Sequence, residues 1–330
     1  MGDRASQRVD AGRRIRVKRR GNALGFWFFR MSLRAFGLRG AYGLLYPVCA
    51  YYLFADRAAA RSASAYLRRR FPSHGRPRRL LDRYRLLLSQ GRSLIDRHVL
   101  LAGGGGLRLR LEGEECLAGA MRSPKGFVLL TAHLGNWQAV MACLKRLRRT
   151  VHLVMRPEDN PAVAESLRIG GGEDAVEIIS PEGHLGGAVA IMKALQRGGI
   201  VSIMGDRSYG FSAVTVPFLG APARLSCGGF HIAATAGCPV VILTSAKTSS
   251  RDYVVRVAGV WHPRYEFGRP KREQRRRWVR AFAGVIEAFV EAYPYQCFLF
   301  HDVWAEARGE GTAPGAAGDA GGGGRRRDGT

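Results

Sequence analysis

The chain lacks the residue patterns that mark metal sites and covalent catalysis. Its six cysteines are scattered, and no pair has the Cys-x-x-Cys spacing of a structural zinc site. The Gly-x-Ser-x-Gly motif, which exposes a serine nucleophile, is absent, and this argues against a covalent acyl-enzyme. Gly103–Gly106 is followed by neither a helix nor Lys, so it is no Walker-type phosphate loop. We therefore expect no metal and no cofactor. The isolated thiols indicate that the protein works in a reducing compartment.

Long hydrophobic runs are also missing. The longest apolar run, Ala41–Ala55, has 15 residues, whereas about 20 are needed to cross a bilayer. Arg30, Arg34 and Arg39 interrupt the apolar stretch before it, which excludes a secretory signal of the usual form. We expect a helix that lies in, or dips into, the cytoplasmic face of the inner membrane, so that the protein is peripheral or monotopic. A buried helical hairpin and a short spanning anchor are the alternatives.

Acidic residues are few. The chain carries 52 Lys and Arg residues against 26 Asp and Glu residues, which gives a formal net charge of +26. A charge of that sign attracts polyanions, such as nucleic acid, anionic lipid headgroups or an acidic carrier protein. Two basic clusters, in residues 1–20 and 269–280, lack the interleaved aromatic side chains that stack on bases. We therefore expect an anionic membrane surface as a partner, with a nucleic-acid-binding protein as the rival.

The chain divides into four predicted segments. Residues 1–22 have almost no large apolar side chains and predict a disordered basic arm, and the Gly- and Ala-rich residues 305–330 predict a disordered tail. Helical spacing of apolar residues predicts a helical, membrane-facing segment over 23–102. Over 107–304, short β-rich runs alternate with helical patterns, which predicts an α/β domain with a mainly parallel sheet flanked by helices.

Individual elements of the α/β domain can be predicted from the same runs. The expected strands are 127–131, 151–155, 176–179, 200–204, 214–219, 240–244 and 253–260. The expected helices are 134–148, 161–167, 185–196, 228–236 and 271–292.

A histidine follows directly after the first of these strands. His133 stands at the end of the run 127–131, where a helix is expected to begin. Open α/β sheets form their sites at such places, because strand ends and helix N-termini make a crevice with free backbone N–H groups. A histidine there can remove a proton from an attacking hydroxyl, while nearby N–H groups stabilise an oxyanion. A buried or helix-capping histidine would show the same local pattern.

Four sequence blocks, in order, resemble the lipid A late acyltransferase family of the lysophospholipid acyltransferase superfamily. They are His133–Gln138, Arg156–Pro161, Gly205–Arg224 and Tyr293–Trp304. The resemblance implies a glycerolipid acyltransferase-like fold. It also implies transfer of a fatty acyl chain from an acyl thioester, on acyl carrier protein or CoA, to a hydroxyl or amine of a membrane lipid or glycolipid.

The resemblance also implies roles for single residues. His133 is the expected general base, and backbone amides near residues 134–136, with Arg156, are expected to stabilise the oxyanion. The expected catalytic residues are His133, Gln138, Arg156 and Asp206. The expected substrate-binding residues are Gly135, Asn136, Asn160, Arg207 and Arg224.

One position departs from the family's pattern. Gln138 stands where the family carries Asp or Glu, five residues after His133. A glutamine can accept a hydrogen bond from the imidazole, but it has no charge with which to stabilise the imidazolium. Another carboxylate, Asp206 or Asp159, could serve His133; otherwise the enzyme is slow, or its acceptor needs less activation. A catalytically impaired, lipid-binding member of the family is the remaining alternative.

Overall fold

The computed structural model of the chain describes residues 23–55, 57–101, 105–144, 147, 149–155, 176–181, 187–207 and 211–305. The chain forms two units, residues 1–44 and residues 45–330. The predicted arm over 1–22, the predicted helix over 161–167 and all but the first residue of the predicted tail lie outside the described residues. The division predicted at 102–107 stays a prediction.

The described part of the first unit belongs to helix α1 (Ala23–Ala55), which continues into the second unit. Gly37 interrupts this helix with a φ of 62° and a ψ of −164°, a combination that a residue with a side chain rarely adopts. No helix in the described part of the chain combines the length and the apolar character that crossing a membrane requires.

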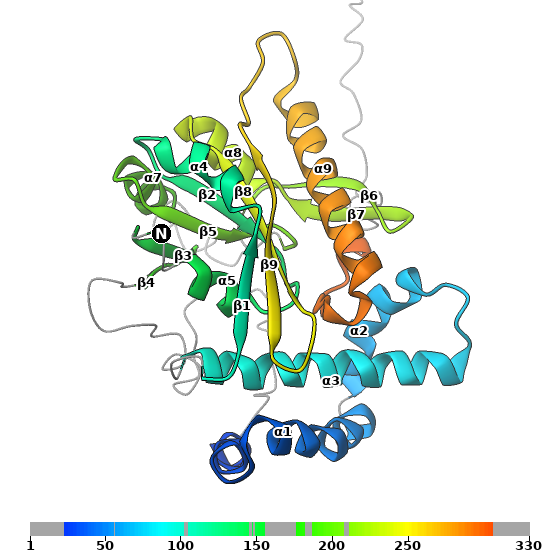
Figure 1. Cartoon of the computed structure of the whole chain (residues 1–330). Helices are drawn as coiled ribbons and strands as arrows, with labels where there is room; N and C mark the ends of the chain where they lie inside the picture. The colour runs from blue at the N-terminus through cyan, green and yellow to red at the C-terminus, as the bar shows by residue number, and fades with distance from the viewer. Residues whose placement is uncertain are drawn as a thin grey trace, which may run out of the picture. The chain divides into compact units, whose positions relative to one another are not determined.

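The second unit contains the last turns of α1, then α2 (Arg57–Arg70) and α3 (Arg76–Leu101). In α3, Leu86 and Ile95 are buried on the side that faces the rest of the unit, while the arginines of the helix are exposed or half-buried. Two aspartates of α3, Asp82 and Asp96, are buried as well. Figure 1 shows α3 passing across the end of the sheet that follows it in the chain.

Seven strands form the main sheet, in the order β1-β9-β8-β2-β5-β3-β4. Five neighbours, from β8 to β4, run parallel; β9 is antiparallel to β8, and β1 is parallel to β9. The strands are β1 (Arg108–Glu112), β2 (Phe127–Thr131), β3 (Val151–Val154), β4 (Val176–Ile179), β5 (Ile200–Met204), β8 (Val240–Lys247) and β9 (Asp252–Trp261). The predicted mainly parallel sheet is therefore confirmed.

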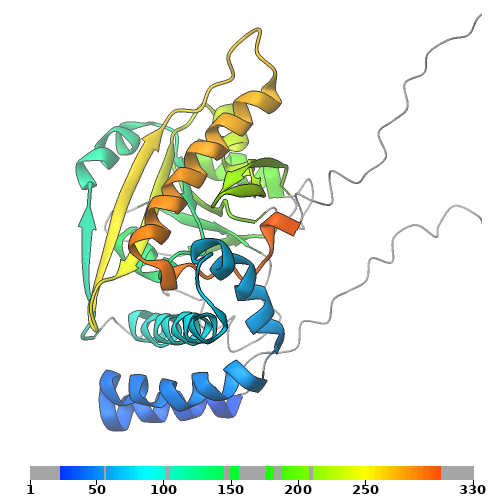
Figure 2. The same ribbon diagram turned by 90° about the vertical axis from the view of Figure 1, so that its right-hand side faces the viewer.

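Helices cover both faces of this sheet because its central strand is apolar on both sides. In β2, Phe127 and Leu129 pack in one cluster with α4 (Glu114–Arg122) and α5 (Trp137–Leu144). Val128 and Leu130 point the other way, into a cluster with α7 (Ala188–Gln196), α8 (Gly228–Ala236) and α9 (Lys271–Ala292). Figure 2 shows α9 lying along its face of the sheet. Both faces of β2 are thus sealed, and only its ends are open to ligands.

Four elements differ from the predicted ones. Residues 214–219 do not join the main sheet: β6 (Ala213–Phe218) pairs with an unpredicted strand, β7 (Ala221–Ser226), in a separate antiparallel sheet. Leu219 and Gly220 both have positive φ at the turn, as a tight hairpin requires. The helix α4 was also not predicted. The strand β1 was not predicted because Arg108–Glu112 alternates charged with apolar residues, as is tolerated at a sheet edge.

Candidate functional site

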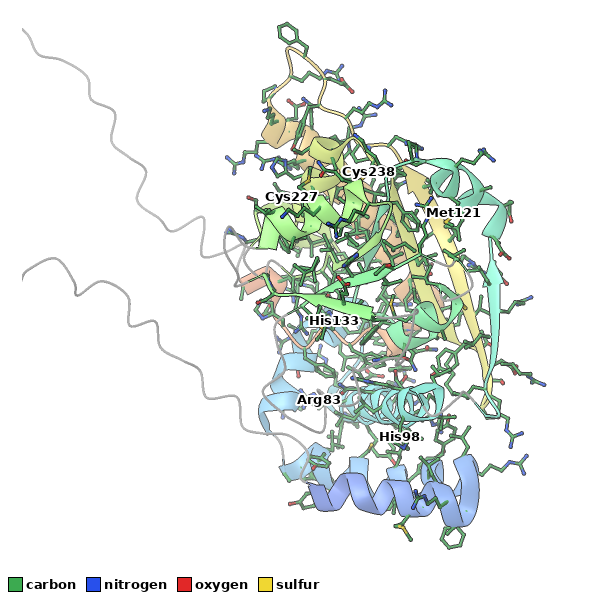
Figure 3. All side chains as sticks on the ribbon, turned by 90° about the vertical axis from the view of Figure 1, so that its left-hand side faces the viewer. Arg83, His98, Met121, His133, Cys227 and Cys238 are labelled. Atoms are coloured by element: carbon green, nitrogen blue, oxygen red, sulfur yellow. The ribbon has the colours of Figure 1, made fainter. Side chains whose placement is uncertain are left out.

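His133 lies just beyond the carboxyl end of β2, in a turn of residues 132–136 that we call the His133 turn. Its Nδ1 is 2.8 Å from Oδ2 of Asp206. Asp206 follows β5, the strand next to β2, and the pairing of Thr131 with Met204 brings both strand ends to one edge of the sheet. Figure 3 shows His133 between the sheet and α3. Two residues far apart in the sequence therefore form a histidine–carboxylate pair.

The Asp206 carboxyl is buried, with 3% of the residue exposed. Burial raises its pKa, but the charge of His133, the hydrogen bond from the imidazole and the nearby Arg207 together hold the pKa below its usual value. An ionised carboxylate can only accept, so Nδ1 of His133 donates and Nε2 remains the nitrogen that can take up a proton. The stability that this carboxylate contributes is present above the ordinary aspartate pKa and is lost as the pH falls through the lower, folded-state pKa.

A cavity of about 270 Å³ opens beside His133. Its lining comes from α3, from the His133 turn and the first residues of α5, from Arg207, and from Phe298 and Phe300. The two phenylalanines belong to residues 293–304, which follow α9 and which we call the closing stretch. Apolar walls with a few polar groups are typical of a ligand site.

The His133 turn packs so closely against β8 that there is no room for a side chain at Gly135. This glycine has a φ of 55°, and a Cβ atom placed on it would lie 1.6 Å from the backbone oxygen of Ser245. Its carbonyl accepts a hydrogen bond from Oγ of Ser93 at 3.2 Å. Gly135 lines the cavity as expected of a substrate-binding residue, but the reason that it must be glycine is the backbone of β8 behind it.

The backbone amides of the His133 turn are already used within the protein. Leu134 N–H donates to the carbonyl of Ala132 at 2.7 Å, and Gly135 N–H donates to the carbonyl of Gln296 at 2.7 Å. Asn136 N–H donates to Oγ of Ser245 at 3.1 Å. These hydrogen bonds count against the prediction that the amides stabilise an oxyanion, because β8 and the closing stretch take up two of the donors and the turn itself takes up the third.

Asn136 caps α5, which begins at Trp137 and not at Leu134 as predicted. Its Oδ1 accepts a hydrogen bond from the N–H of Gln138 at 3.1 Å, and its Nδ2 donates to the carbonyl of Ser93 at 3.3 Å. The residue is 1% exposed. Its polar atoms therefore hold the turn in shape, and the structure gives it this role in place of the expected substrate contact.

Gln138 lines the cavity but does not hold the imidazole. The hydrogen-bond partner of the His133 ring is Asp206, one of the two carboxylates that the sequence left open as an alternative to Gln138. The Gln138 residue is 4% exposed, and its Nε2 has no hydrogen-bond partner among the described residues. Asp206, at the end of β5, supplies the carboxylate that position 138 lacks. The side-chain N–H₂ of Gln138 is buried without an acceptor among the described residues.

Of the two other expected arginines that the structure describes, one lines the cavity and one does not. Arg207 lines the cavity beside Asp206, whereas Arg224 lies on β7 and is not part of the cavity lining. Gly205 precedes Asp206 and Arg207, and a Cβ atom on it would lie 2.8 Å from the Phe282 ring, so packing against α9 accounts for this glycine. Arg156, Asp159 and Asn160 lie outside the described residues.

Sequence reasoning missed the contribution of α3 to the site. Gln90, Ser93, Leu94 and Arg97 of this helix line the cavity. The Arg97 guanidinium also lies 5.7 Å from the centre of the Trp137 ring, within cation–π range. No local signal marks these residues, because Arg97 is one arginine among many and the segment precedes the His133 block by a whole strand and helix.

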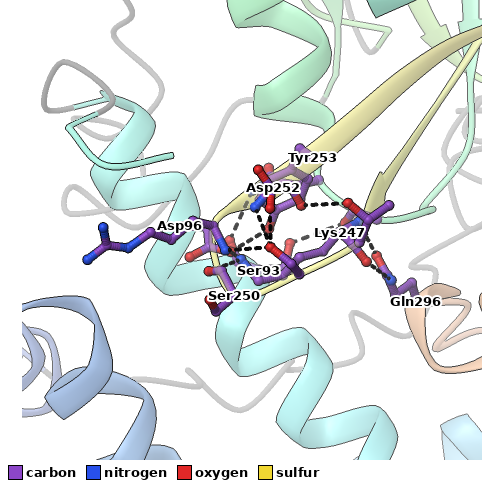
Figure 4. A network of polar contacts seen from close by, with 12 residues as sticks. Ser93, Asp96, Lys247, Ser250, Asp252, Tyr253 and Gln296 are labelled. Carbon is purple, nitrogen blue, oxygen red and sulfur yellow. Dashed lines mark hydrogen bonds and ion pairs between the residues drawn. The ribbon is translucent and has the colours of Figure 1, made fainter. Parts of the chain in front are cut away.

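Two buried carboxylates hold α3 in place. Asp96, which is fully buried, accepts hydrogen bonds from Nζ of Lys247 at 2.7 Å and from the hydroxyl of Tyr253 at 2.5 Å (Figure 4). Burial lowers the pKa of Lys247, and Asp96 offsets only part of that effect. Nearer the start of the helix, Asp82 accepts from the hydroxyl of Tyr295 at 2.7 Å. The helix wall of the cavity is thus bonded to β8, β9 and the closing stretch.

One comparison with known proteins shows the class of enzyme, namely the match to a family model. The family model described as bacterial lipid A biosynthesis acyltransferase matches residues 106–306, more than half of the chain. Among solved structures, the crystal structure of the 1-acyl-sn-glycerophosphate (LPA) acyltransferase PlsC from Thermotoga maritima is 13% identical, with a TM-score of 0.35, over 74% of this chain and 96% of that chain. No curated protein sequence matches the chain.

Proposed function

Because the chain belongs to the bacterial lipid A biosynthesis acyltransferase family, we propose that it moves a fatty acyl chain from an acyl thioester to a hydroxyl or amine of a membrane lipid or glycolipid. That it is an acyltransferase acting on lipids follows from the family itself. The proposal adds the donor, a thioester of acyl carrier protein or CoA, and the acceptor group. The observation that carries it is the hydrogen bond between buried Asp206 and His133 at the edge of the cavity.

The residues of the site suit direct transfer without an acyl-enzyme. Nε2 of His133 takes the proton from the acceptor oxygen as that oxygen attacks the thioester carbonyl carbon. Asp206 keeps Nδ1 protonated and balances the charge of the imidazolium. When the C–S bond breaks, the leaving sulfur takes the proton from His133. The products are the acylated lipid and a free thiol, and His133 returns to its starting state.

The walls of the cavity support lipid substrates. Leu94, Phe298 and Phe300 offer apolar surface to hydrocarbon, and Arg97 and Arg207 offer positive charge to phosphate or another anionic group of a headgroup or donor. Both kinds of surface meet beside His133. This arrangement is what a reaction between an acyl chain and a polar acceptor requires.

The first test of the proposal is replacement of His133 by Ala. Without the general base, acyl transfer should fall by about 10²–10⁴-fold. The measurement is transfer of a labelled acyl chain to a bacterial lipid extract, with acyl carrier protein as donor in one arm and CoA in the other. The two arms decide which thioester is used.

A matched control is His231→Ala, which removes an exposed imidazole that is hydrogen-bonded to Tyr265 and does not line the cavity. It should leave transfer unchanged. Unaltered transfer by His133→Ala would contradict the proposed chemistry. Lipid binding without transfer by any variant would leave a lipid-binding protein in its place.

We further propose that the protein is peripheral or monotopic at the cytoplasmic face of the inner membrane. Within the second unit, the last turns of α1 bury Leu45 and Cys49 but expose Tyr46, Tyr51 and Phe54, at 46%, 67% and 69%. An aromatic surface on a protein with net charge +26 suits an anionic lipid interface.

This proposal predicts that the protein sediments with vesicles that contain phosphatidylglycerol and much less with vesicles of phosphatidylcholine alone. Added salt should weaken the sedimentation, because it screens the attraction between the charges. The double substitution Tyr51→Ser and Phe54→Ser should weaken it at every salt concentration. Failure of the wild-type protein to sediment with either kind of vesicle would refute the membrane assignment.

A further inference from the structure

We infer that Gln296, in the closing stretch, is a positioning residue that holds His133 in line with Asp206, an inference that rests on the proposed function. The backbone of the His133 turn is bonded to the closing stretch at two places. The carbonyl of His133 accepts from the N–H of Phe298 at 2.7 Å, and the N–H of Gly135 donates to the carbonyl of Gln296 at 2.7 Å. The position of the closing stretch therefore sets the position of the His133 backbone.

The side chain of Gln296 ties the closing stretch to the main sheet. Its Oε1 accepts a hydrogen bond from the backbone N–H of Lys247 at 2.8 Å, and its Nε2 donates to the carbonyl of the same residue at 2.8 Å (Figure 4). The side-chain amide thus bonds to both backbone groups of one residue, as a hydrogen-bonded residue of a neighbouring antiparallel strand would. Lys247 is the last residue of β8, so Gln296 docks against the end of a strand.

Lys247 is a fixed point, because it is held through both its backbone and its side chain. Its strand, β8, lies between β2 and β9 in the main sheet. The Nζ atom of Lys247 donates to the buried carboxylate of Asp96 on α3 at 2.7 Å. Loss of the Gln296 amide would therefore loosen the closing stretch and leave the sheet and α3 where they are.

The pair of His133 and Asp206 is sensitive to such a movement, because its two members are held by different parts of the protein. Asp206 is carried by β5, whereas the backbone of His133 is bonded to the closing stretch. Their hydrogen bond is 2.8 Å long, and a shift of about 1 Å would take the two atoms out of hydrogen-bonding range. A misplacement of about 1 Å can lower a rate by about 10²-fold, even when the changed residue lies away from the reacting atoms. Gln296 thus acts on catalysis through His133.

The test replaces Gln296 by Met, which keeps the length of the side chain without its hydrogen bonds. The kcat of acyl transfer should fall by about 10–10²-fold, because the general base is displaced. The KM of the thioester donor should change by less than the kcat, since the wall of the cavity that α3 supplies stays in place. Both constants are measured with a labelled thioester donor and a bacterial lipid extract, below the Tm of the variant.

The matched control is Gln274→Met. The Gln274 side chain pairs with the backbone of Glu266 in the same way, accepting from its N–H at 2.8 Å and donating to its carbonyl at 3.1 Å, and it also donates to the carbonyl of Arg269 at 3.0 Å. Gln274 lies in the first turn of α9, at the end of the helix away from the closing stretch. The control should lower the Tm at least as much as Gln296→Met does, because it loses one hydrogen bond more. It should nevertheless keep the wild-type kcat.

A double variant shows whether Gln296 acts through His133. Residues that act as a unit have non-additive effects on the rate. Addition of Gln296→Met to His133→Ala should therefore leave the residual transfer of His133→Ala unchanged, since no base is left to position. A further fall by the factor seen in the single variant would overturn the inference.

Gln296→Asn is the second variant, and it decides the matter if Gln296→Met shows no cooperative unfolding. Its amide is one methylene too short to reach Lys247, so the kcat should fall as in Gln296→Met. A wild-type kcat in a folded Gln296 variant would overturn the inference and leave the proposed function intact. So would an equal loss of kcat in Gln274→Met. Absence of transfer by the wild type itself would remove both.

Discussion

Replacement of Asp206 by Asn should lower the kcat of acyl transfer by about 10⁴-fold, the loss seen when the orienting carboxylate of a serine-protease triad becomes an amide. The amide can present an N–H to Nδ1 of His133 at the place where Oδ2 now accepts at 2.8 Å. Nδ1 would then lose its proton and Nε2 would carry it, which is the wrong tautomer for a base. The measurement is kcat with a labelled thioester donor at saturating acceptor.

The control for this change is Asp252→Asn. The Asp252 carboxylate pairs with Arg108 at the surface, where an ion pair contributes little to stability, and it does not line the cavity. That variant should keep the wild-type kcat. Activity of Asp206→Asn within tenfold of the wild type would show that the pair in the structure is not the one that carries out catalysis.

Replacement of Asp96 by Ala should lower the free energy of unfolding by about 3–5 kcal/mol, because removal of one partner leaves a buried charge unpaired. Nζ of Lys247 would keep its hydrogen bond to the carbonyl of Ser250 but lose the carboxylate at 2.7 Å. The hydroxyl of Tyr253 would lose its acceptor too. The measurement is denaturant unfolding of the wild type and the variant at neutral pH.

A double variant tests the reason for this loss. Asp96→Leu with Lys247→Met removes both charges and should recover part of the lost stability, because apolar side chains of similar size can replace a buried ion pair. The Tyr253 hydroxyl still lacks its acceptor in this variant, so the recovery is incomplete. A single variant within 1 kcal/mol of the wild type, on the order of a surface pair, would contradict the assignment. So would a double variant as unstable as the single one.

The sheet could be predicted where strands are apolar on both faces. β2 and β5 are buried along almost their whole length, so each appears in the sequence as an unbroken apolar run. β1 and β7 escaped prediction because they lie at an edge or in the small hairpin, where charged residues and Pro222 are tolerated. A strand's signal in sequence thus depends on how much of it the fold covers.

The site could be predicted only in part, because its residues meet through sheet order. His133 stood out by its place after a strand, and Asp206 was among the expected catalytic residues. Their contact depends on β5 lying next to β2, although β3 and β4 come between them in the chain. The hydrogen bonds of the amides in the His133 turn could not be predicted either, because two of their acceptors, Gln296 and Ser245, belong to later segments of the chain.

The closing stretch also sets the moment at which the site can form during synthesis. The carbonyl of Gln296 accepts from Gly135 N–H, and the N–H of Phe298 donates to the carbonyl of His133 at 2.7 Å. The ribosome adds these two residues long after His133 itself has left the exit tunnel. A nascent chain that stops short of these residues lacks the two hydrogen bonds that hold the His133 turn. The enzyme should therefore stay inactive until its C-terminal segment has been synthesised.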